Sequence, residues 1–187
     1  HITDDGKINT KKLKTTITTA MRMLDNVIEY NYYSVDKAKN SNLKHRPVGL
    51  GVMGFQDALY KIRVPYESEE AVNFADKSME YVSYFAIEAS MELAKERGAY
   101  ESFSGSLWSQ GIMPIDSLKK LKTIRGKYLD VNLDESLKWN ELRDKVKKHG
   151  MRNSNTLAIA PTATISNICG VSQSIEPTYQ NLYVKSN

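Results

Sequence analysis

The strongest constraint on the fold is a stretch of about 30 residues with the periodicity of a single long helix. Between Glu67 and Arg97, hydrophobic residues recur at every third or fourth position, which places them on one helix face. The acidic residues at its start suit the positive end of the helix dipole, and Gly98 is a typical C-terminal stop. Such a helix would be roughly 45 Å long, enough to pack along the side of a barrel or sheet. Its predicted apolar face consists of Ala71, Ala75, Met79, Val82, Ala86, Ala89 and Leu93.

Three shorter helices are predicted from the same spacing of hydrophobic residues. The first covers Lys11–Tyr30 and is amphipathic, with Asn9 or Thr10 as its cap. The second is short and covers Phe55–Ile62, and the third covers Trp139–His149. The chain is therefore expected to be rich in helix.

The segments between these helices carry weaker signals. We expect Asn31–His45 to be a polar connector and Tyr100–Pro114 to be a Ser/Gly loop, whereas Asp116–Asp134 shows no clear pattern. The short apolar run 156–160 is a candidate buried strand, and Leu182–Val184 has the composition of another. The predicted elements are mostly helices with a few short strands, and the length of the chain is enough for one domain with a core.

Composition and charge narrow the class of protein. Hydrophobic residues make up 41% and charged residues 26%, which is the balance of an ordinary globular protein with a core. No apolar run approaches the roughly 20 residues that span a bilayer, and the first residues are polar, so a cytoplasmic location is expected. The net charge is +4, but the basic clusters are mixed with acids, which favours a solvated surface over a nucleic-acid interface.

The residues that most often bind metals or form disulfides are scarce. A single cysteine, Cys169, excludes a disulfide within the chain and a multi-cysteine zinc site. We expect Cys169 to be a buried structural thiol inside a helix, because no nearby base or cation is evident. The three histidines have no metal-ligand spacing, so no metal site is expected. Glu176 precedes a proline and is predicted to be a turn residue, with a buried functional role left open.

Residues 49–54 match the letters of the dinucleotide fingerprint G-x-G-x-x-G. That fingerprint requires a buried strand before it, but the preceding residues are polar and interrupted by Pro47. No acidic residue ends a second strand about 20 residues later. We therefore favour a second interpretation, in which the glycines allow a neighbouring segment to approach the backbone closely.

The most informative segment follows the candidate strand, at Pro161, Thr162, Ala163, Thr164 and Ile165. It lies where an apolar run ends and a helix can begin, and the first turn of a helix has free N–H groups and a positive dipole end. These groups can bind an anion without any charged side chain. Small residues would let a phosphate approach, and the threonine hydroxyls would add donors. The alternative is an ordinary helix start capped by threonine; a P-loop is excluded because its lysine motif is missing.

Several segments, in order, resemble the large subunit of ribonucleotide reductase. In this region the family has a tryptophan, a leucine three residues later, a Gly-hydrophobic-Arg-Asn sequence and then a proline. The corresponding residues here are Trp139, Leu142, 150–153 and Pro161. Further matching segments are 46–51, 88–98, 111–112, 157–168, 174–177 and 181–183. The resemblance covers roughly residues 46–187, and several motifs in sequence are much more specific than any one of them.

The resemblance implies both a fold and an activity. The fold would be a helix-rich part of a ten-stranded α/β barrel, from its second half, and the activity would be reduction of the 2′-hydroxyl of a ribonucleotide for DNA synthesis. In that family the segment matching Pro161–Ile165 binds the phosphates of the substrate, here a ribonucleoside diphosphate. The glycine motif would then be a backbone feature of the family.

Residues that the family uses for its chemistry have no match in this sequence. The radical cysteine with its Asn-x-Cys-x-Glu arrangement, the ATP-cone, the specificity loops and the redox-active tail are missing, and Cys169 matches none of the reactive cysteines. No catalytic residue is therefore assigned, and we predict that the chain alone has no reductase activity. Many class I members have a hydroxyl residue where this chain has Ile165, and some adenosylcobalamin-dependent class II relatives have isoleucine. The ending at 181–186 is more similar to class I, which we favour.

The implied cofactor and partners follow from the family. The complete enzyme relies on a radical generator, either the metal cofactor of a small subunit or adenosylcobalamin, and neither is expected to bind this chain directly. The expected partners are the rest of the large subunit, a radical-generating small subunit in class I, and a second copy through exposed strand edges. Two other functions remain open at this point: a free-standing nucleotide- or phosphate-binding module, and a helical protein without a ligand.

Overall fold

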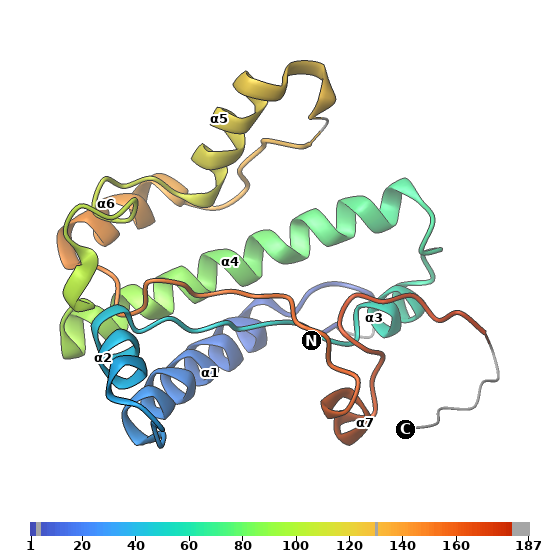
Figure 1. Cartoon of the computed structure of the whole chain (residues 1–187). Coiled ribbons are helices and arrows are strands. Elements are labelled where there is room, and N and C mark those ends of the chain that lie inside the picture. The colour runs from blue at the N-terminus through green and yellow to red at the C-terminus, as the bar shows by residue number, and fades with distance from the viewer. Residues whose placement is uncertain (3–4, 130, 181–187) are drawn as a thin grey trace.

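The computed structural model describes residues 1–2, 5–129 and 131–180 and is built mainly of helices (Figure 1). The long helix α4 lies across the middle of the molecule, with α1 along one side of it and α6 on the other. The elements in chain order are α1 (Thr10–Tyr30), α2 (Asp36–His45), α3 (Phe55–Ile62), α4 (Glu69–Arg97), η1 (Glu101–Phe103), α5 (Pro114–Arg125), η2 (Gly126–Tyr128), α6 (Trp139–His149) and α7 (Ile165–Cys169).

The long helix forms as predicted because both of its ends are capped. The Ser68 hydroxyl accepts a hydrogen bond from the Ala71 amide at 3.1 Å, which satisfies one free donor of the first turn. At the other end, the Gly98 amide donates to the Ala94 carbonyl at 2.8 Å, with Gly98 at a φ of 86° that favours glycine. The predictions for α1, α3 and α6 are also confirmed, and Asn9 is the cap of α1, accepting from the Lys12 amide at 3.0 Å.

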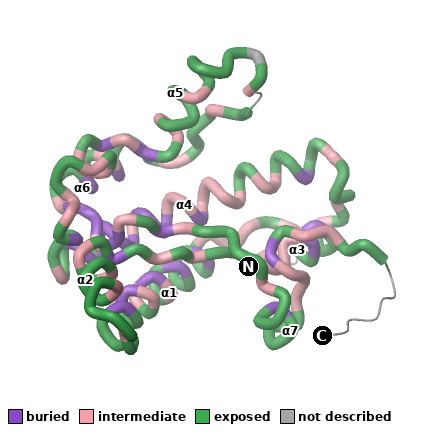
Figure 2. The backbone as a smooth tube through the Cα atoms, viewed as in Figure 1, coloured by how far each residue is buried: buried purple, intermediate pink, exposed green. Residues whose placement is uncertain are grey.

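The first core lies between α1 and α4. Hydrophobic residues at helical spacing on α1 pack against the middle of α4, where Val82, Ala86 and Ala89 of the predicted apolar face are buried. Of that face, Ala75 and Met79 are only half-buried. Figure 2 shows buried positions along both helices. Each large aliphatic or aromatic side chain buried here contributes roughly 1.5–3 kcal/mol to folding. The buried members are Leu13, Ile17, Met21, Val82, Phe85, Ala86 and Ala89.

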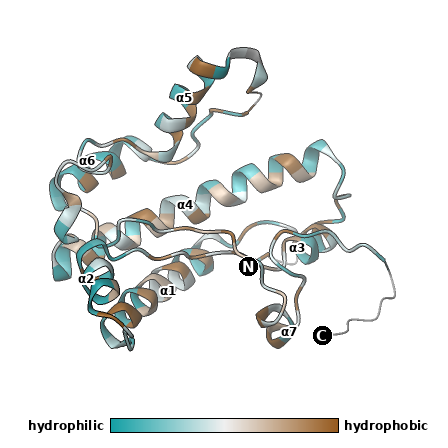
Figure 3. Cartoon of the chain, viewed as in Figure 1, coloured by the Kyte–Doolittle hydropathy of each residue, from teal (hydrophilic) through white to brown (hydrophobic). Residues whose placement is uncertain are grey.

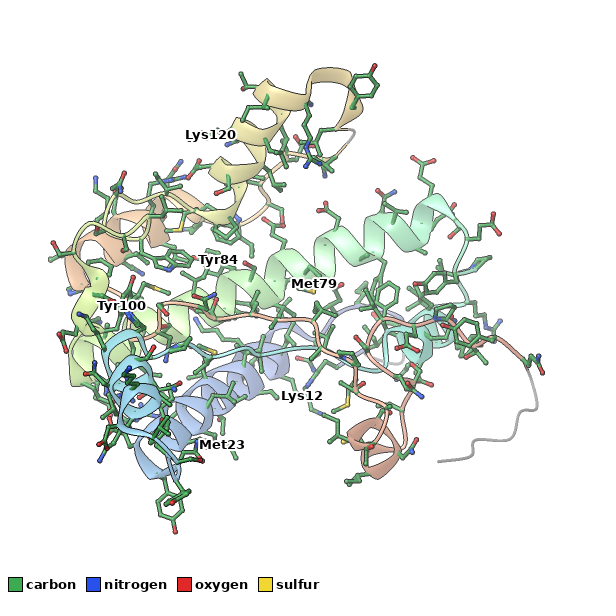
Figure 4. The ribbon with its side chains drawn as sticks, viewed as in Figure 1. Lys12, Met23, Met79, Tyr84, Tyr100 and Lys120 are labelled. Carbon is green, nitrogen blue, oxygen red and sulfur yellow. The ribbon has the colours of Figure 1, made fainter. Side chains whose placement is uncertain are left out.

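A second core joins the other side of α4 to α6. Trp139 packs edge-on against Tyr84, with ring centroids 5.2 Å apart, and Tyr100 closes the cluster next to Phe103. Tyr84 and Tyr100 are labelled in Figure 4, between α4 and the α6 region. The α6 start is also fixed by hydrogen bonds, because the Glu80 carboxylate accepts from the Trp139 indole at 2.9 Å and from the Leu137 amide at 3.2 Å. The buried members of this core are Ile87, Met91, Tyr100, Met113, Trp139, Leu142, Val146 and Met151.

Two extended segments lie side by side: one follows α2 and includes residues 48–50, and the other follows α6 and includes residues 155–158. Leu50 and Leu157 form a parallel bridge, with the Leu50 amide donating to Thr156 at 2.9 Å and the Ala158 amide donating to Leu50 at 3.1 Å. The predicted buried strand at 156–160 is therefore wrong in extent: within the described residues it is one bridged residue, followed by exposed Ala158–Ala160. The strand cannot extend or become buried because no other described segment pairs with its remaining edge.

Two helices were missed from the sequence. The segment Asn31–His45 is not a plain connector, since it contains α2, and the segment without a clear pattern contains α5. Neither helix has a buried residue, so neither has the hydrophobic periodicity that reveals a helix in a sequence. The start of α5 is stabilised by a cap instead: the Asp116 carboxylate accepts from the Met113 amide at 2.8 Å.

The α5 arm projects from the rest of the molecule (Figure 1), and its ribbon alternates between hydrophilic and hydrophobic residues (Figure 3). Its base is fixed by Arg143 of α6, which donates to Asp116 in an ion pair. This hydrogen bond, more than any other contact, holds the pKa of Asp116 below its ordinary value. Lys120, labelled in Figure 4, is exposed on the arm.

A buried polar cluster, which we call the Asp25 hub, ties the chain together near the C-terminal ends of α1 and α4. The fully buried Asp25 carboxylate accepts from Arg46 at 2.9 Å, Arg97 at 3.1 Å, Arg152 at 3.2 Å and Asn153 at 3.2 Å. A buried charge is tolerated when it is paired and hydrogen-bonded in this way. The hub fixes where both extended segments begin, because Arg46 starts one of them and Asn153 the other.

Candidate functional site

Residues 161–165 lead from the end of the second extended segment into Ile165, the first residue of α7, and all but the half-buried Thr162 are exposed (Figure 2). The Ser166 amide donates to the Thr162 carbonyl at 3.0 Å and the Asn167 amide to the Thr164 carbonyl at 3.1 Å, so helical bonding starts there. In the part of the chain that the structure describes, the amides of Thr164 and Ile165 donate no hydrogen bond, and both residues are exposed. The segment is thus the first turn of α7, and two of its amides are left without an acceptor among the described residues.

The other three residues of the turn differ in what they can contribute to anion binding. Pro161 has no N–H group, and Ala163 adds little bulk. The Thr162 hydroxyl oxygen accepts the Ser174 amide at 2.7 Å, which commits one of its lone pairs to the fold. A hydroxyl also has a hydrogen to donate, so Thr162 can still face an anion. The role of Pro161–Ile165 in phosphate binding stays a prediction at this stage.

Residues 171–174, which we call the return segment, run back from α7 past the turn. Its ends are held by the start of α3: the Gly54 amide donates to the Ser172 carbonyl at 2.9 Å, and the Ser172 amide donates to the Asp57 carboxylate at 2.6 Å. The Phe55 amide donates to the Ser174 carbonyl at 3.4 Å. Sequence reasoning missed Asp57 and the return segment, since an acidic residue in a first helical turn is common and carries no specific signal.

The glycine motif supports close backbone approach, as favoured from the sequence. A Cβ atom on Gly51 would lie 2.7 Å from the Ala158 carbonyl oxygen, and one on Gly49 would lie 2.9 Å from the Ala158 Cβ. Side chains at these positions would push the two extended segments apart. The motif therefore serves the pairing that leads to the 161–165 turn.

Two predictions about single residues have different outcomes. Cys169 is exposed, so the prediction of a buried thiol is wrong; α7 has five residues and lies on the surface, with Ser166 as its buried member. Glu176 lies in a turn as predicted, with its amide donating to the Gln173 carbonyl at 2.9 Å. Among the described residues, no three His, Cys, Asp or Glu side chains are grouped so that they could hold a metal ion.

Apolar surface surrounds the turn. Ile159, Ile165, Ile168 and Ile175 are all exposed, and Ile168 retains 82% of its accessible surface. An open cavity of about 560 Å³ lies nearby, and its apolar lining includes Leu13, Ile17, Leu50, Val82 and Val171. None of the described helices is long and apolar enough to cross a membrane.

A family profile and individual relatives both match this chain to the same protein family. A family profile described as "Ribonucleotide reductase, barrel domain" matches residues 1–187. The ribonucleoside-diphosphate reductase subunit alpha of Chlamydia muridarum is 56% identical over 189 residues, covering 100% of this chain and 18% of that protein. The subunit alpha of Helicobacter pylori strain 26695 is 42% identical (97% of this chain, 23% of that protein), and the large chain of Schizosaccharomyces pombe is 41% identical (96% and 21%).

The chain therefore belongs to the ribonucleotide reductase barrel-domain family, which confirms the resemblance seen in the sequence. It spans about a fifth of the length of the curated relatives it matches, from 18% to 23% in these three.

Proposed function

We propose that the chain forms part of the large subunit of a ribonucleoside-diphosphate reductase and binds the phosphates of the substrate at Pro161–Ile165. The observation that supports this proposal is the exposed start of α7, where the Thr164 and Ile165 amides have no acceptor among the described residues. Family membership supports it, because the relatives bear the name of that enzyme.

The turn would act by binding and orienting the substrate. Amide hydrogens at a helix start carry partial positive charge and match the oxygens of a diphosphate. The Thr162 and Thr164 hydroxyls would add donors to further oxygens, and no charged side chain is needed. The turn would hold the ribose at a fixed place, while reduction of its 2′-hydroxyl would be carried out by cysteines outside this sequence.

The proposed environment is a ten-stranded α/β barrel. The parallel pairing of Leu50 with Leu157 is the contact expected between neighbouring barrel strands. The exposed isoleucines around the turn and the cavity beside α1 fit a surface that other parts of a large subunit would cover. The remainder of that subunit is therefore the first proposed partner, and the cytoplasm the proposed location.

The group that generates the radical differs between the classes of ribonucleotide reductase. We favour class I, with a metal cofactor in a small subunit, over an adenosylcobalamin-dependent enzyme. Either group would supply the radical that starts the reaction, and we assign no residue of this chain to its binding.

A charge substitution in the turn tests the proposal. The test protein is the C. muridarum subunit alpha in which this chain replaces the matching segment; we call it the composite subunit. Ile165→Asp should weaken binding of a ribonucleoside diphosphate at least about tenfold by calorimetry, because a carboxylate would face the phosphates. Ile165→Asn is the control of equal size and should bind nearly as well as the parent.

Two further measurements complete the test. Binding of the corresponding nucleoside, which has no phosphate, should be unchanged by Ile165→Asp. The 187-residue chain alone should bind the diphosphate weakly and produce no deoxynucleotide. Equal diphosphate affinity in the Asp and Asn variants would contradict the proposal, and tight binding by the chain alone would favour a free-standing phosphate-binding module.

A further inference from the structure

The turn at 161–165 is held in place by a contact from another element. The Ser174 amide donates to the Thr162 hydroxyl, so the position of Thr162 depends on the return segment. Ser174 is 4% exposed and has a φ of 41°, a left-handed conformation that non-glycine residues seldom adopt. Such a conformation persists when surrounding contacts over-determine it. The contacts that fix the return segment therefore also fix the turn.

The first turn of α3 provides those contacts. The Gly54 and Phe55 amides, which have no partner within their own helix, donate to the carbonyls of Ser172 and Ser174. The Asp57 carboxylate accepts the Ser172 amide at 2.6 Å, the shortest of these bonds. A hydrogen bond to an ionised carboxylate is roughly twice as strong as one between neutral groups. Asp57, although exposed, is thus the side-chain acceptor through which α3 holds the return segment.

We infer that Asp57 is a positioning residue for substrate phosphate binding. Its carboxylate fixes Ser172, the next two residues carry that position to Ser174, and the Ser174 amide fixes the Thr162 hydroxyl. The inference rests on the proposed function of the turn and adds a residue more than 100 positions away in the sequence.

Without the anchor, the turn would sample several positions and bind the diphosphate more weakly. Residues at the reacting end of the substrate would be unaffected once it is bound. The effect should therefore appear in KM and leave kcat nearly unchanged, which separates positioning from a loss of folded protein.

Three variants of the composite subunit test this inference. Asp57→Ala should raise KM for the ribonucleoside diphosphate about tenfold, with kcat within about twofold, because the acceptor for Ser172 is lost. Asp57→Asn keeps an acceptor oxygen at the same place and should restore KM to within about twofold of the parent. Asp36→Ala is the matched control, because Asp36 also lies in the first turn of a helix. This substitution removes a favourable charge at the start of α2 and leaves the return segment unchanged.

Amide hydrogen exchange in the 187-residue chain gives a readout that does not need activity. Asp57→Ala should accelerate exchange at Ser172 and Ser174, whereas Asp57→Asn should preserve their protection. An unchanged KM in Asp57→Ala, or equal losses in the Ala and Asn variants, would overturn the inference. If Ile165→Asp weakens diphosphate binding and Asp57→Ala does not, the anchor fails while the proposed function stands.

Discussion

The two ends of the extended pair are built in opposite ways. At one end, the Asp25 hub is buried and its carboxylate accepts four donors from three arginines and an asparagine. At the other end, the 161–165 turn is mostly exposed, and within the described part of the chain the Ser174 amide of the return segment donates to its Thr162 hydroxyl. Figure 1 shows these ends on opposite sides of the molecule, near α2 and near α7. Stability is concentrated where no ligand is proposed, and the proposed binding turn remains accessible.

The largest expected effect is at the hub. Asp25→Ala should destabilise the chain by about 3–5 kcal/mol, because it leaves the buried Arg46 and the partly buried Arg97 and Arg152 without the carboxylate that they share. The measurement is urea denaturation followed by circular dichroism. Asp25→Asn keeps an acceptor and should be less damaging. A loss below about 1 kcal/mol would mean that the hub does not carry the stability of this end.

The next effect concerns the segment that links the two ends. Gly51→Ala should cost about 1–3 kcal/mol, since its Cβ would meet the Ala158 carbonyl oxygen, which is backbone and cannot move aside easily. The same denaturation assay measures it. Gly49→Ala should cost a similar amount, because its Cβ would lie 2.9 Å from the Ala158 Cβ, which is fixed to the backbone and cannot rotate aside. A loss below about 0.5 kcal/mol in both variants would show that the extended pair separates without strain.

A pH effect is expected at Glu80 of α4, whose carboxylate accepts hydrogen bonds from the start of α6. Burial raises the pKa of Glu80, but hydrogen bonds from Ser136, Trp139 and Leu137 outweigh burial, so the pKa lies below its ordinary value of 4.5. The carboxylate therefore stabilises the fold fully above pH 4.5, and this contribution is lost as the pH falls through the lowered pKa.

Glu80→Gln should therefore remove part of the acid dependence of stability. At neutral pH it should cost about 1–2 kcal/mol, from weaker hydrogen bonds to the start of α6. Thermal melts from pH 3 to pH 7 measure both effects. Parallel pH curves for the parent and the variant would exclude Glu80 as the titrating group.

The smallest expected effect is at Ser166 of α7, next to the 161–165 turn. The Ser166 hydroxyl is buried and has no hydrogen-bond partner among the described residues, so it contributes a desolvation cost without a compensating bond. Ser166→Ala should leave stability unchanged or raise it by up to about 1 kcal/mol. A clear destabilisation in the denaturation assay would show that this hydroxyl has a partner in solution, and would weaken the contrast between the two ends.

The candidate turn was located from the sequence because its signal is local. An apolar run, a proline and two threonines before a helix lie within ten residues, and the helix-start argument needs nothing further. The anchor could not be found in this way, because Asp57 and Ser172 are 115 positions apart and neither has an unusual neighbour. The thiol of Cys169 was misplaced for a related reason: burial depends on what packs against α7.

The sequence by itself determined the family and the helices α1, α3, α4 and α6, since periodicity and caps act over one or two turns of chain. Only the tertiary structure decided which charges meet at Asp25, where the extended segments pair, and what holds the 161–165 turn. Those contacts join residues far apart in sequence, and their energies depend on burial and geometry that residue types alone do not specify.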